Sequence, residues 1–308
     1  MQTGKQAAAK GVSPLHIENL SIVNAEGQEV LLRGVSSHGM QWFGQYVNYD
    51  VLKWLRDDWK INVFRAAMMI DEGGYHQDPR IKDKLIEAIE AAIALDLYIV
   101  VDWHNTVGDP TPTLEEEIVF FQEIMEKYKQ YPNLIYEIYN EPNGQDVRWE
   151  NKIRPFAEKM VQAIRKTDPD HLILVGTATW SQDVHEAADH PLEDPNVMYV
   201  AHFYAGTHGQ SIRDQVAYAL QKGVPVMVTE WGVSTCSGGG GVYLEETKEW
   251  LQFMEENRMS WINWNISDKQ ESSAALLPGA SDKGGWTEAE LSASGKLIRE
   301  YLRTGKIC

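Results

Sequence analysis

Short apolar runs alternate with longer amphipathic segments along most of this chain. The runs are rich in Val, Ile, Tyr and Trp, as buried strands are, and the segments between them place apolar residues at helical spacing. The predicted strands cover residues 30–35, 62–67, 98–101, 134–139, 172–175, 197–203, 226–229 and 261–266. The predicted helices cover residues 49–59, 81–95, 149–166, 181–188, 212–221, 244–256 and 295–302, with one more that begins at Thr113 and stops at Pro132. Eight strand and helix alternations without a change of composition predict one (β/α)8 TIM barrel, an α/β fold.

The length of 308 residues fits one barrel of about 250 residues with an additional element. A doubly wound open sheet is the alternative, but no Gly-x-Gly-x-x-Gly turn follows the first strand. Residues 15–32 alternate apolar and polar side chains around Asn24-Ala25-Glu26-Gly27, which predicts a β-hairpin that closes the bottom of the barrel. Residues 1–14 are small and polar, so we expect a linker or an expression remnant there and a single domain over residues 15–308.

The charge balance limits the partners. With 28 basic and 45 acidic residues the formal charge is −17, which argues against nucleic acid and anionic membranes. No apolar run approaches the ~20 residues that cross a bilayer, and residues 1–14 lack the apolar core of a signal peptide. The protein is therefore either cytosolic or secreted with its signal removed, and we expect the second and a monomer. Cys236 and Cys308 do not decide the compartment.

Two apolar runs each lead to a glutamate. They are Ile135 to Pro142 (IYEIYNEP), with Glu141, and Val226 to Gly232 (VMVTEWG), with Glu230. Carboxylates at the C-terminal ends of barrel strands lie where these folds place their chemistry. The separation is 230 − 141 = 89 residues, and at roughly 30 residues per βα unit the two strands lie three units apart, across the barrel mouth. Two facing carboxylates are what glycoside hydrolysis requires.

The surroundings of the two glutamates suggest different roles. Glu230 has Arg65 and Tyr204 as groups that could hold it ionised by charge and hydrogen bonding, as a nucleophile requires. For Glu141, burial, the nearby Glu230 and other acidic groups should raise the pKa and retain the proton of a general acid. Asn140 could form a hydrogen bond with a sugar 2-hydroxyl. The simpler alternative is a pair of buried glutamates bound to arginine for structural reasons.

Further polar residues end or follow predicted strands and therefore reach the same rim. With the two glutamates, the predicted catalytic residues are Arg65, His104, Asn140, His202 and Tyr204. Barrel hydrolases also bind zinc through strand-end histidines, which brings His38, His104 and His202 into question. The first strand offers a lone His38 instead of a His-x-His pair, so we expect no metal and no cofactor.

Aromatic residues add a sugar-binding signal. Trp42, Trp180 and Trp264 follow or end strands one, five and eight, and sugar rings pack well on flat aromatic faces. Any one of them could instead belong to the core, but 11 tryptophans in such an acidic chain favour some exposure to a ligand. Lys269 and Glu271 could bind hydroxyl groups of an outer sugar, with a solvated surface ion pair as the simpler alternative.

Short motifs in order along nearly the whole chain resemble family 5 glycoside hydrolases. They are Asn62-Val63-Phe64-Arg65, Asp102-Trp103-His104, Asn140-Glu141-Pro142, His202-Phe203-Tyr204 and Thr229-Glu230-Trp231-Gly232. The chain is most similar to bacterial endo-β-1,4-glucanases of the Bacillus type. That likeness rests on Ser36-Ser37-His38-Gly39, Gln41-Trp42, Thr179-Trp180-Ser181-Gln182-Asp183, Gly206-Thr207-His208-Gly209 and the Lys269-x-Glu271-Ser272-Ser273-Ala274 run.

The resemblance implies a retaining mechanism without a metal, with Glu141 as acid/base and Glu230 as nucleophile. It also implies roles for the residues around them. Arg65, His104, Asn140, His202, Tyr204 and Trp264 would surround the cleaved linkage, His38, Trp42, Lys269 and Glu271 would bind glucose units on the non-reducing side, Trp180 would stack on the leaving side, and His208 would contact substrate.

The chain departs from its close relatives at three places. These are Met68-Met69-Ile70, where relatives often carry tyrosine, residues 105–112, and Cys236. All three are expected to flank the cleft and to bear on substrate preference. We predict an endo-acting β-1,4-glucanase that binds cellulose, soluble β-glucans or cello-oligosaccharides. The alternatives are a β-mannan, xylan or xyloglucan endo-hydrolase and a non-catalytic carbohydrate-binding barrel.

Overall fold

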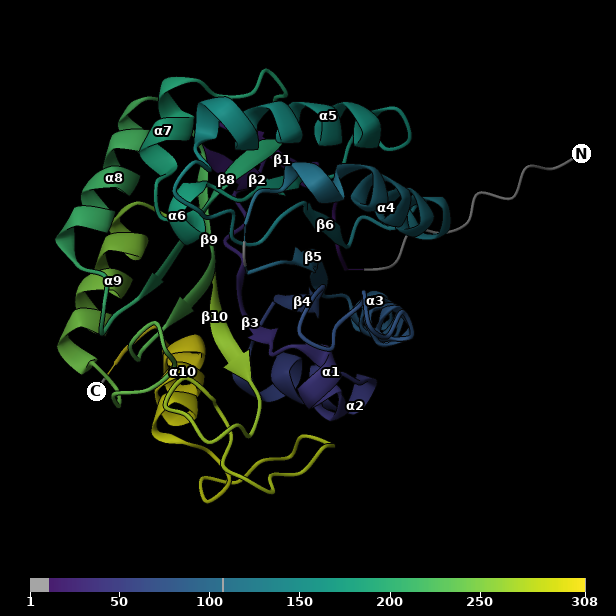
Figure 1. The fold of residues 1–308 in the computed structure, drawn as a ribbon. Coiled ribbons are helices and arrows are strands. Elements are labelled where there is room, and N and C mark those ends of the chain that lie inside the picture. Colours follow the sequence, from purple (N-terminus) through teal and green to yellow (C-terminus); the bar gives the residue numbers. More distant parts are fainter. Residues whose placement is uncertain (1–10, 107, 308) are drawn as a thin grey trace, which may run out of the picture.

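The computed structural model describes residues 11–106 and 108–307. Eight parallel strands close into a barrel (Figure 1). In order they are β3 (Arg33–Ser37), β4 (Val63–Met69), β5 (Tyr98–His104), β6 (Leu134–Glu137), β7 (Ile173–Val175), β8 (Val197–Tyr204), β9 (Val226–Gly232) and β10 (Trp261–Ile266). β10 pairs in parallel with β3 and closes the ring. The predicted (β/α)8 barrel is confirmed.

Helices surround the barrel and cover its outer face (Figure 1). They are α1 (Met40–Phe43), α2 (Tyr49–Trp54), α3 (Ile81–Ala94), α4 (Leu114–Tyr128), α5 (Arg154–Arg165), α6 (Ala178–Ser181), α7 (Val184–Asp189), α8 (Gln210–Gln221), α9 (Leu244–Glu256) and α10 (Ala293–Thr304), with the short helical segments η1 (Gly44–Tyr46), η2 (Leu55–Trp59), η3 (Thr111–Thr113) and η4 (Trp149–Ile153). The barrel strands are buried along almost their full length because helices cover them outside and side chains fill the interior. Among the described residues, no helix combines the length and apolar character needed to span a membrane.

The observed strand ends differ from the predicted ones because pairing with a neighbour extends or shortens a strand. β5 continues to His104, which pairs with the last residue of β4. β9 continues to Gly232, so Glu230 lies inside this strand instead of just after it. β6 stops at Glu137, which leaves Glu141 in the loop that follows. The first barrel strand begins at Arg33, three residues later than predicted.

The N-terminal hairpin also differs from the prediction. β1 (His16–Glu18) pairs with β2 (Ser21–Val23) in antiparallel register. The turn lies at Asn19 and Leu20, both with positive φ, as two-residue hairpins require. The predicted turn at residues 24–27 is present, with Gly27 N donating to the Asn24 carbonyl at 2.9 Å, but only an isolated bridge follows it.

The bottom of the barrel is closed as predicted. Leu15 and Ile22, on either side of the hairpin turn, pack in one apolar cluster with residues of the lowest barrel layer, such as Leu32 and Met227. Val12 belongs to the same cluster, so the ordered packing begins before the predicted boundary at residue 15. Residues 1–10, most of the predicted linker, lie outside the described residues.

Glu117 on α4 is a buried carboxyl outside the barrel mouth. Its side chain has no exposed surface. Oε1 accepts a hydrogen bond from Thr113 Oγ1 at 2.6 Å, and Oε2 has no hydrogen-bond partner among the described residues. Burial raises the pKa of Glu117 well above its usual range, against a lowering effect of the Thr113 bond. The folded protein therefore favours a protonated Glu117.

This burial predicts that Glu117→Gln stabilises the protein more at alkaline than at acidic pH. The unfolded carboxyl titrates near 4.5, whereas the folded one keeps its proton to higher pH. The free energy of unfolding of the wild type therefore falls above pH 4.5 by up to about 1.4 kcal/mol per unit, until the folded pKa is reached. The melting temperature of the variant minus that of the wild type should grow between pH 4.5 and pH 8. Glu115→Gln, exposed on the same helical turn, is the matched control, and an equal difference at both pH values would contradict the prediction.

Candidate active site

The two predicted glutamates meet in a cleft at the C-terminal rim of the barrel. Their strands, β6 and β9, lie three strands apart in the ring, as predicted. A carboxylate oxygen of Glu141, one of Glu230 and a ring nitrogen of His202 lie within 4.8 Å of one another. The cleft has a volume of about 450 Å³ and is lined by Glu141, Thr179, Trp180, Gln182, His202, Tyr204, His208, Glu230 and Cys236.

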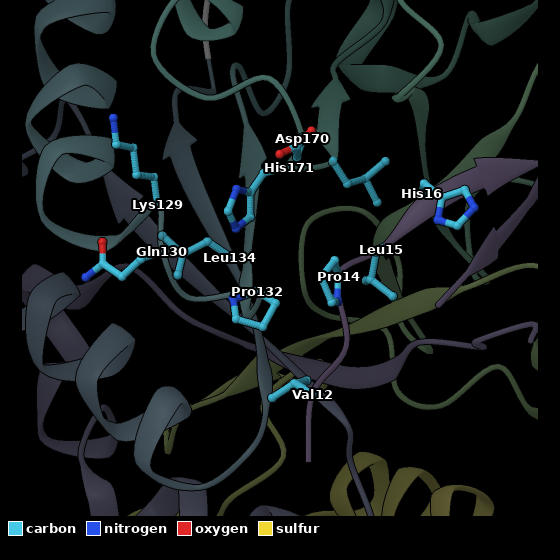
Figure 2. A pocket seen from close by; sticks show the side chains of 11 residues that line it. Val12, Pro14, Leu15, His16, Lys129, Gln130, Pro132, Leu134, Asp170 and His171 are labelled. Atoms are coloured by element: carbon cyan, nitrogen blue, oxygen red, sulfur yellow. The ribbon is translucent and has the colours of Figure 1, made fainter. Parts of the chain in front are cut away.

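A second pocket of about 430 Å³ lies at the opposite end of the barrel (Figure 2). Its lining is mainly apolar, with residues such as Val12, Leu15 and Pro132. Both of its imidazoles have protein partners. His171 has Nδ1 2.7 Å from Asp168 and Nε2 2.8 Å from a backbone carbonyl, and His16 Nε2 lies 3.1 Å from Glu18 Oε1. Because no pair of carboxylates faces this pocket, we assign the chemistry to the cleft at the rim.

Arg65 organises the groups beneath the cleft. It is the third residue of β4 and fully buried, so it lies below the rim and not at the strand end where the sequence placed it. Its guanidinium contacts Asp102 at 3.0 Å, Glu137 at 2.7 Å, Glu230 at 3.0 Å and the Asn140 side-chain oxygen at 2.6 Å. Burial alone would lower the pKa of Arg65, but the three carboxylates raise it overall. One buried cation thus holds three acids in fixed positions.

Two of these acids were not predicted as site residues. Glu137 lies within the same apolar run as Glu141, has no exposed surface and accepts from the Thr229 hydroxyl at 2.7 Å. Asp102 is hydrogen-bonded to His104 Nδ1 at 2.7 Å, and burial raises the pKa of Asp102 to about 7 against the lowering effect of the arginine. The signal that could have identified them is a charged residue inside a buried strand, which is rare unless the charge is paired.

Glu230 is held by the two neighbours that the sequence predicted. The Tyr204 hydroxyl donates to Oε1 at 2.7 Å, and Arg65 donates to Oε2 at 3.0 Å. The tyrosine reaches this position because Gly232 lies opposite it in the β8–β9 ladder. A Cβ at that glycine would lie 2.5 Å from the tyrosine ring. Both carboxylate oxygens are therefore bound by donors, which holds the carboxylate in one orientation.

Glu141 lies in a different environment. Its Oε1 is 2.9 Å from His202 Nδ1, and its side chain is 13% exposed. Burial raises the pKa of Glu141 to about 8, the buried arginine opposes this, and Asp102 and Glu137 add to it. The prediction named burial, Glu230 and other acidic groups as causes of a raised pKa. Burial and the other acidic groups do raise it, whereas Glu230 is not among the causes. The two glutamates thus have divergent environments, as an acid and a nucleophile require.

The histidines considered as zinc ligands have protein partners. His38 Nδ1 accepts from Gly39 N at 2.7 Å, and His104 is bound to Asp102 and stacked on Trp264, with centroids 5.3 Å apart. Burial lowers the pKa of His38 to about 3 and the pKa values of His104 and His202 to about 4. These rings are therefore neutral parts of the network around the glutamates.

On one side of the cleft, four residues assigned to outer glucose units lie together. Lys269 Nζ is 2.7 Å from Glu271 and 3.3 Å from His38 Nε2. The His38 and Trp42 rings are 5.7 Å apart, and Trp42 is 45% exposed. A flat apolar face thus adjoins a group of polar side chains, a combination suited to sugar rings.

On the other side, Trp180 is 46% exposed and lines the cleft with His208 and Cys236. His208 Nδ1 accepts from the backbone of Tyr204 at 2.9 Å, so part of its role is structural. Trp264 differs from the other two tryptophans because it is only 8% exposed and packs against His104. It is not among the residues that line the cleft.

Only some of the residues that differ from close relatives lie at the cleft. Cys236 lines it and is exposed, whereas Met68 is fully buried in the core and does not flank it. Asn105 lies at the site because its carbonyl accepts from the Asn140 side chain and from Glu141 N, both at 3.2 Å. The predicted bond from Asn140 to a sugar stays a prediction, since its side chain is fully buried. Cys308 lies outside the described residues.

Residues 23–270 match the family described as cellulase (glycosyl hydrolase family 5). The chain belongs to this family. The family 5 assignment confirms the resemblance drawn from the motifs and agrees with the observed barrel.

Two proteins named endoglucanases are similar to this chain. The chain is 57% identical over 278 residues to Endoglucanase A of Evansella cellulosilytica. The aligned segment is 90% of this chain and 57% of that protein. The chain is 53% identical over 292 residues to Endoglucanase 5 of Pectobacterium carotovorum, covering 94% and 58%. The chain therefore spans less than two thirds of the length of these two relatives.

Solved structures match along nearly the whole chain. Cellulase Cel5C_n superposes with a TM-score of 0.92 at 40% identity, covering 99% of this chain and 97% of that one. The catalytic domain of Thermobifida fusca endoglucanase Cel5A gives 0.89 at 36% identity, covering 94% and 97%. A variant of that domain in complex with cellotetraose gives 0.89 at 35% identity, with the same coverage.

Proposed function

We propose that this family 5 protein is a retaining endo-β-1,4-glucanase, with Glu230 as nucleophile and Glu141 as acid/base. The observation that carries the proposal is the short distance between the two glutamates, since one carboxylate oxygen of each lies within 4.8 Å of the other. Retaining glycosidases hold their carboxyl groups roughly 5 to 5.5 Å apart, whereas inverting enzymes leave about 6.5 to 9.5 Å for a water molecule.

The contacts fit a two-step reaction. In the first step, Glu230 attacks the anomeric carbon while Glu141 gives its proton to the leaving oxygen, so the glycosidic bond breaks and a glucosyl ester forms. In the second step, Glu141 takes a proton from water, the resulting hydroxide bonds to the anomeric carbon, and the ester bond breaks. Tyr204 and Arg65 hold the nucleophile in both steps.

The preference for β-1,4-glucan rests on the cleft and on the relatives. Exposed Trp42 follows β3 and exposed Trp180 follows β7, and these strands are four apart in the eight-strand ring. Sugars bound to both rings would extend across the mouth of the barrel in both directions, as endo cleavage requires. The similar proteins are named endoglucanases, and one related catalytic domain binds cellotetraose. A polymeric substrate is too large to enter a cell, so we infer that the protein works outside it, and we propose that it acts as a monomer.

A polysaccharide panel tests the proposal. Carboxymethyl cellulose and mixed-linkage β-glucan should release reducing ends and lose viscosity early, while xylan, mannan and xyloglucan should react more slowly. Activity should survive EDTA, because the two carboxylates perform the chemistry without a metal. A faster reaction on xylan or mannan would favour the alternative hydrolases, and binding without any product would favour a carbohydrate-binding barrel. Glu230→Gln is the inactive control.

The pKa of Glu141 predicts the alkaline limit of activity. The enzyme requires a protonated Glu141 to cleave the bond, and burial raises this pKa to about 8. We therefore expect kcat/KM to be level near neutral pH and to fall about tenfold per unit above about pH 8, since each unit removes that fraction of the acid. A pH profile on cellopentaose measures this limb. A fall that begins near pH 5 would contradict a raised pKa.

A further inference from the structure

A chain of three hydrogen bonds runs from Glu141 away from the substrate. Glu141 Oε1 lies 2.9 Å from His202 Nδ1, and the opposite ring nitrogen, Nε2, lies 2.8 Å from Thr229 Oγ1. The threonine hydroxyl lies 2.7 Å from Glu137 Oε1. Thr229 and Glu137 have no exposed surface, and neither reaches the cleft lining.

The chemistry of these groups decides which one donates and which one accepts in each hydrogen bond. Glu137 is bound by Arg65 through Nε at 2.7 Å and through a terminal nitrogen at 3.3 Å, so it is a carboxylate and can only accept. The single Thr229 proton is therefore donated to Glu137. The hydroxyl oxygen must then accept from His202, which places the ring proton on Nε2.

His202 accordingly presents a lone pair to Glu141. Burial keeps this ring neutral by lowering its pKa to about 4, and a neutral imidazole carries one proton only. Since Nε2 holds it, Nδ1 is an acceptor. A hydrogen bond across the 2.9 Å contact then requires that the proton belong to Glu141.

We propose that Thr229 and Glu137 are positioning residues that fix the tautomer of His202 and thereby keep the proton on Glu141. This inference rests on the proposed function, in which Glu141 is the acid/base. The opposite tautomer would donate to the Glu141 carboxylate and stabilise its ionised form, which weakens the acid. With the observed tautomer, ionised Glu141 faces a lone pair and remains a strong base for the second step. The charged and titratable groups facing Glu141 and His202 are Arg65 (β4), Asp102 and His104 (β5), Glu137 (β6), Tyr204 (β8), His208 in the loop after β8, and Glu230 (β9).

Removing the threonine hydroxyl tests the proposal by kinetics. Thr229→Val should lower kcat/KM on cello-oligosaccharides by roughly 10- to 100-fold, a fraction of what general acid catalysis contributes. It should change the rate of bond cleavage in dinitrophenyl cellobioside by less than about threefold, because this leaving group needs little protonation. The alkaline limb of the pH profile should move to lower pH.

Two further variants serve as controls. Thr229→Ser retains the hydroxyl and should restore both the rate and the pH limb. Thr177→Val removes another buried threonine hydroxyl, which donates to the Val200 carbonyl at 3.1 Å and does not contact His202. It should leave the ratio of the two substrates unchanged. Equal losses on both substrates in Thr229→Val would mean that the nucleophile has moved and would overturn the proposal.

The tautomer can be observed directly in the wild type, which needs no variant that might fail to fold. Nitrogen-15 spectra of the histidine rings at pH 7, with the His202 signals assigned by their loss in His202→Gln, should show a neutral ring protonated at Nε2. A ring protonated at Nδ1, or a charged ring, would overturn the inference. Glycanase activity on the polysaccharide panel is measured separately, so loss of the tautomer assignment and loss of the proposed function give different results.

Discussion

Replacement of Glu230 with alanine is expected to lower kcat by a factor on the order of 10⁴ to 10⁶ on every substrate, including aryl cellobiosides. The variant lacks the carboxylate that forms the covalent bond, and Tyr204 and Arg65, which both donate to Glu230, cannot replace it. Steady-state rates on carboxymethyl cellulose and on dinitrophenyl cellobioside measure the loss.

The position of the covalent bond provides a second readout. A 2-deoxy-2-fluoro cellobiosyl donor should label the wild type on the peptide that contains Glu230 and should not label the alanine variant. Azide should restore some activity to the variant and yield the α-glycosyl azide, because it attacks from the face that the carboxylate has vacated. Glu271→Gln, in an outer part of the cleft, is the glutamate control and should still be labelled. A label on any other residue would refute the assignment of the nucleophile.

Replacement of Glu141 with alanine is expected to have a large effect that depends on the leaving group. Cello-oligosaccharides should react about 10²- to 10⁴-fold more slowly, since their leaving alcohol must be protonated. Aryl glycosides with acidic phenols should retain rapid ester formation and accumulate the glucosyl ester, because the second step lacks its base. A burst of phenol followed by slow turnover in stopped-flow experiments would show this.

Azide distinguishes the two glutamates. With Glu141→Ala it should react with the ester on Glu230 and give the β-glycosyl azide, the opposite anomer to that from the nucleophile variant. Glu141→Gln, nearly the same size, controls for loss of packing next to His202 and should show the same dependence on the leaving group. Equal losses on natural and activated substrates would contradict the acid/base role.

Much of this site was predictable because it depends on local patterns. Strand-sized apolar runs alternating with helical ones specify the barrel, and the position of a polar residue relative to the end of a strand indicates the rim. Glu141, Glu230, His202 and Tyr204 were placed in this way. Trp264 and Met68 were predicted less well, since burial depends on neighbours that are distant in the sequence.

The sequence by itself determined that this chain forms a (β/α)8 barrel with two glutamates facing each other across its mouth, because hydrophobic periodicity and strand spacing are local properties. Only the tertiary structure decided which atoms meet beneath them. Arg65 joins Glu137, 72 residues away, to Glu230, 165 residues away, and Thr229 lies 27 residues from His202. These contacts depend on the relative register of strands around a closed ring, and a one-residue shift would turn each side chain to the opposite face. The different surroundings of the two glutamates therefore come from the assembled barrel.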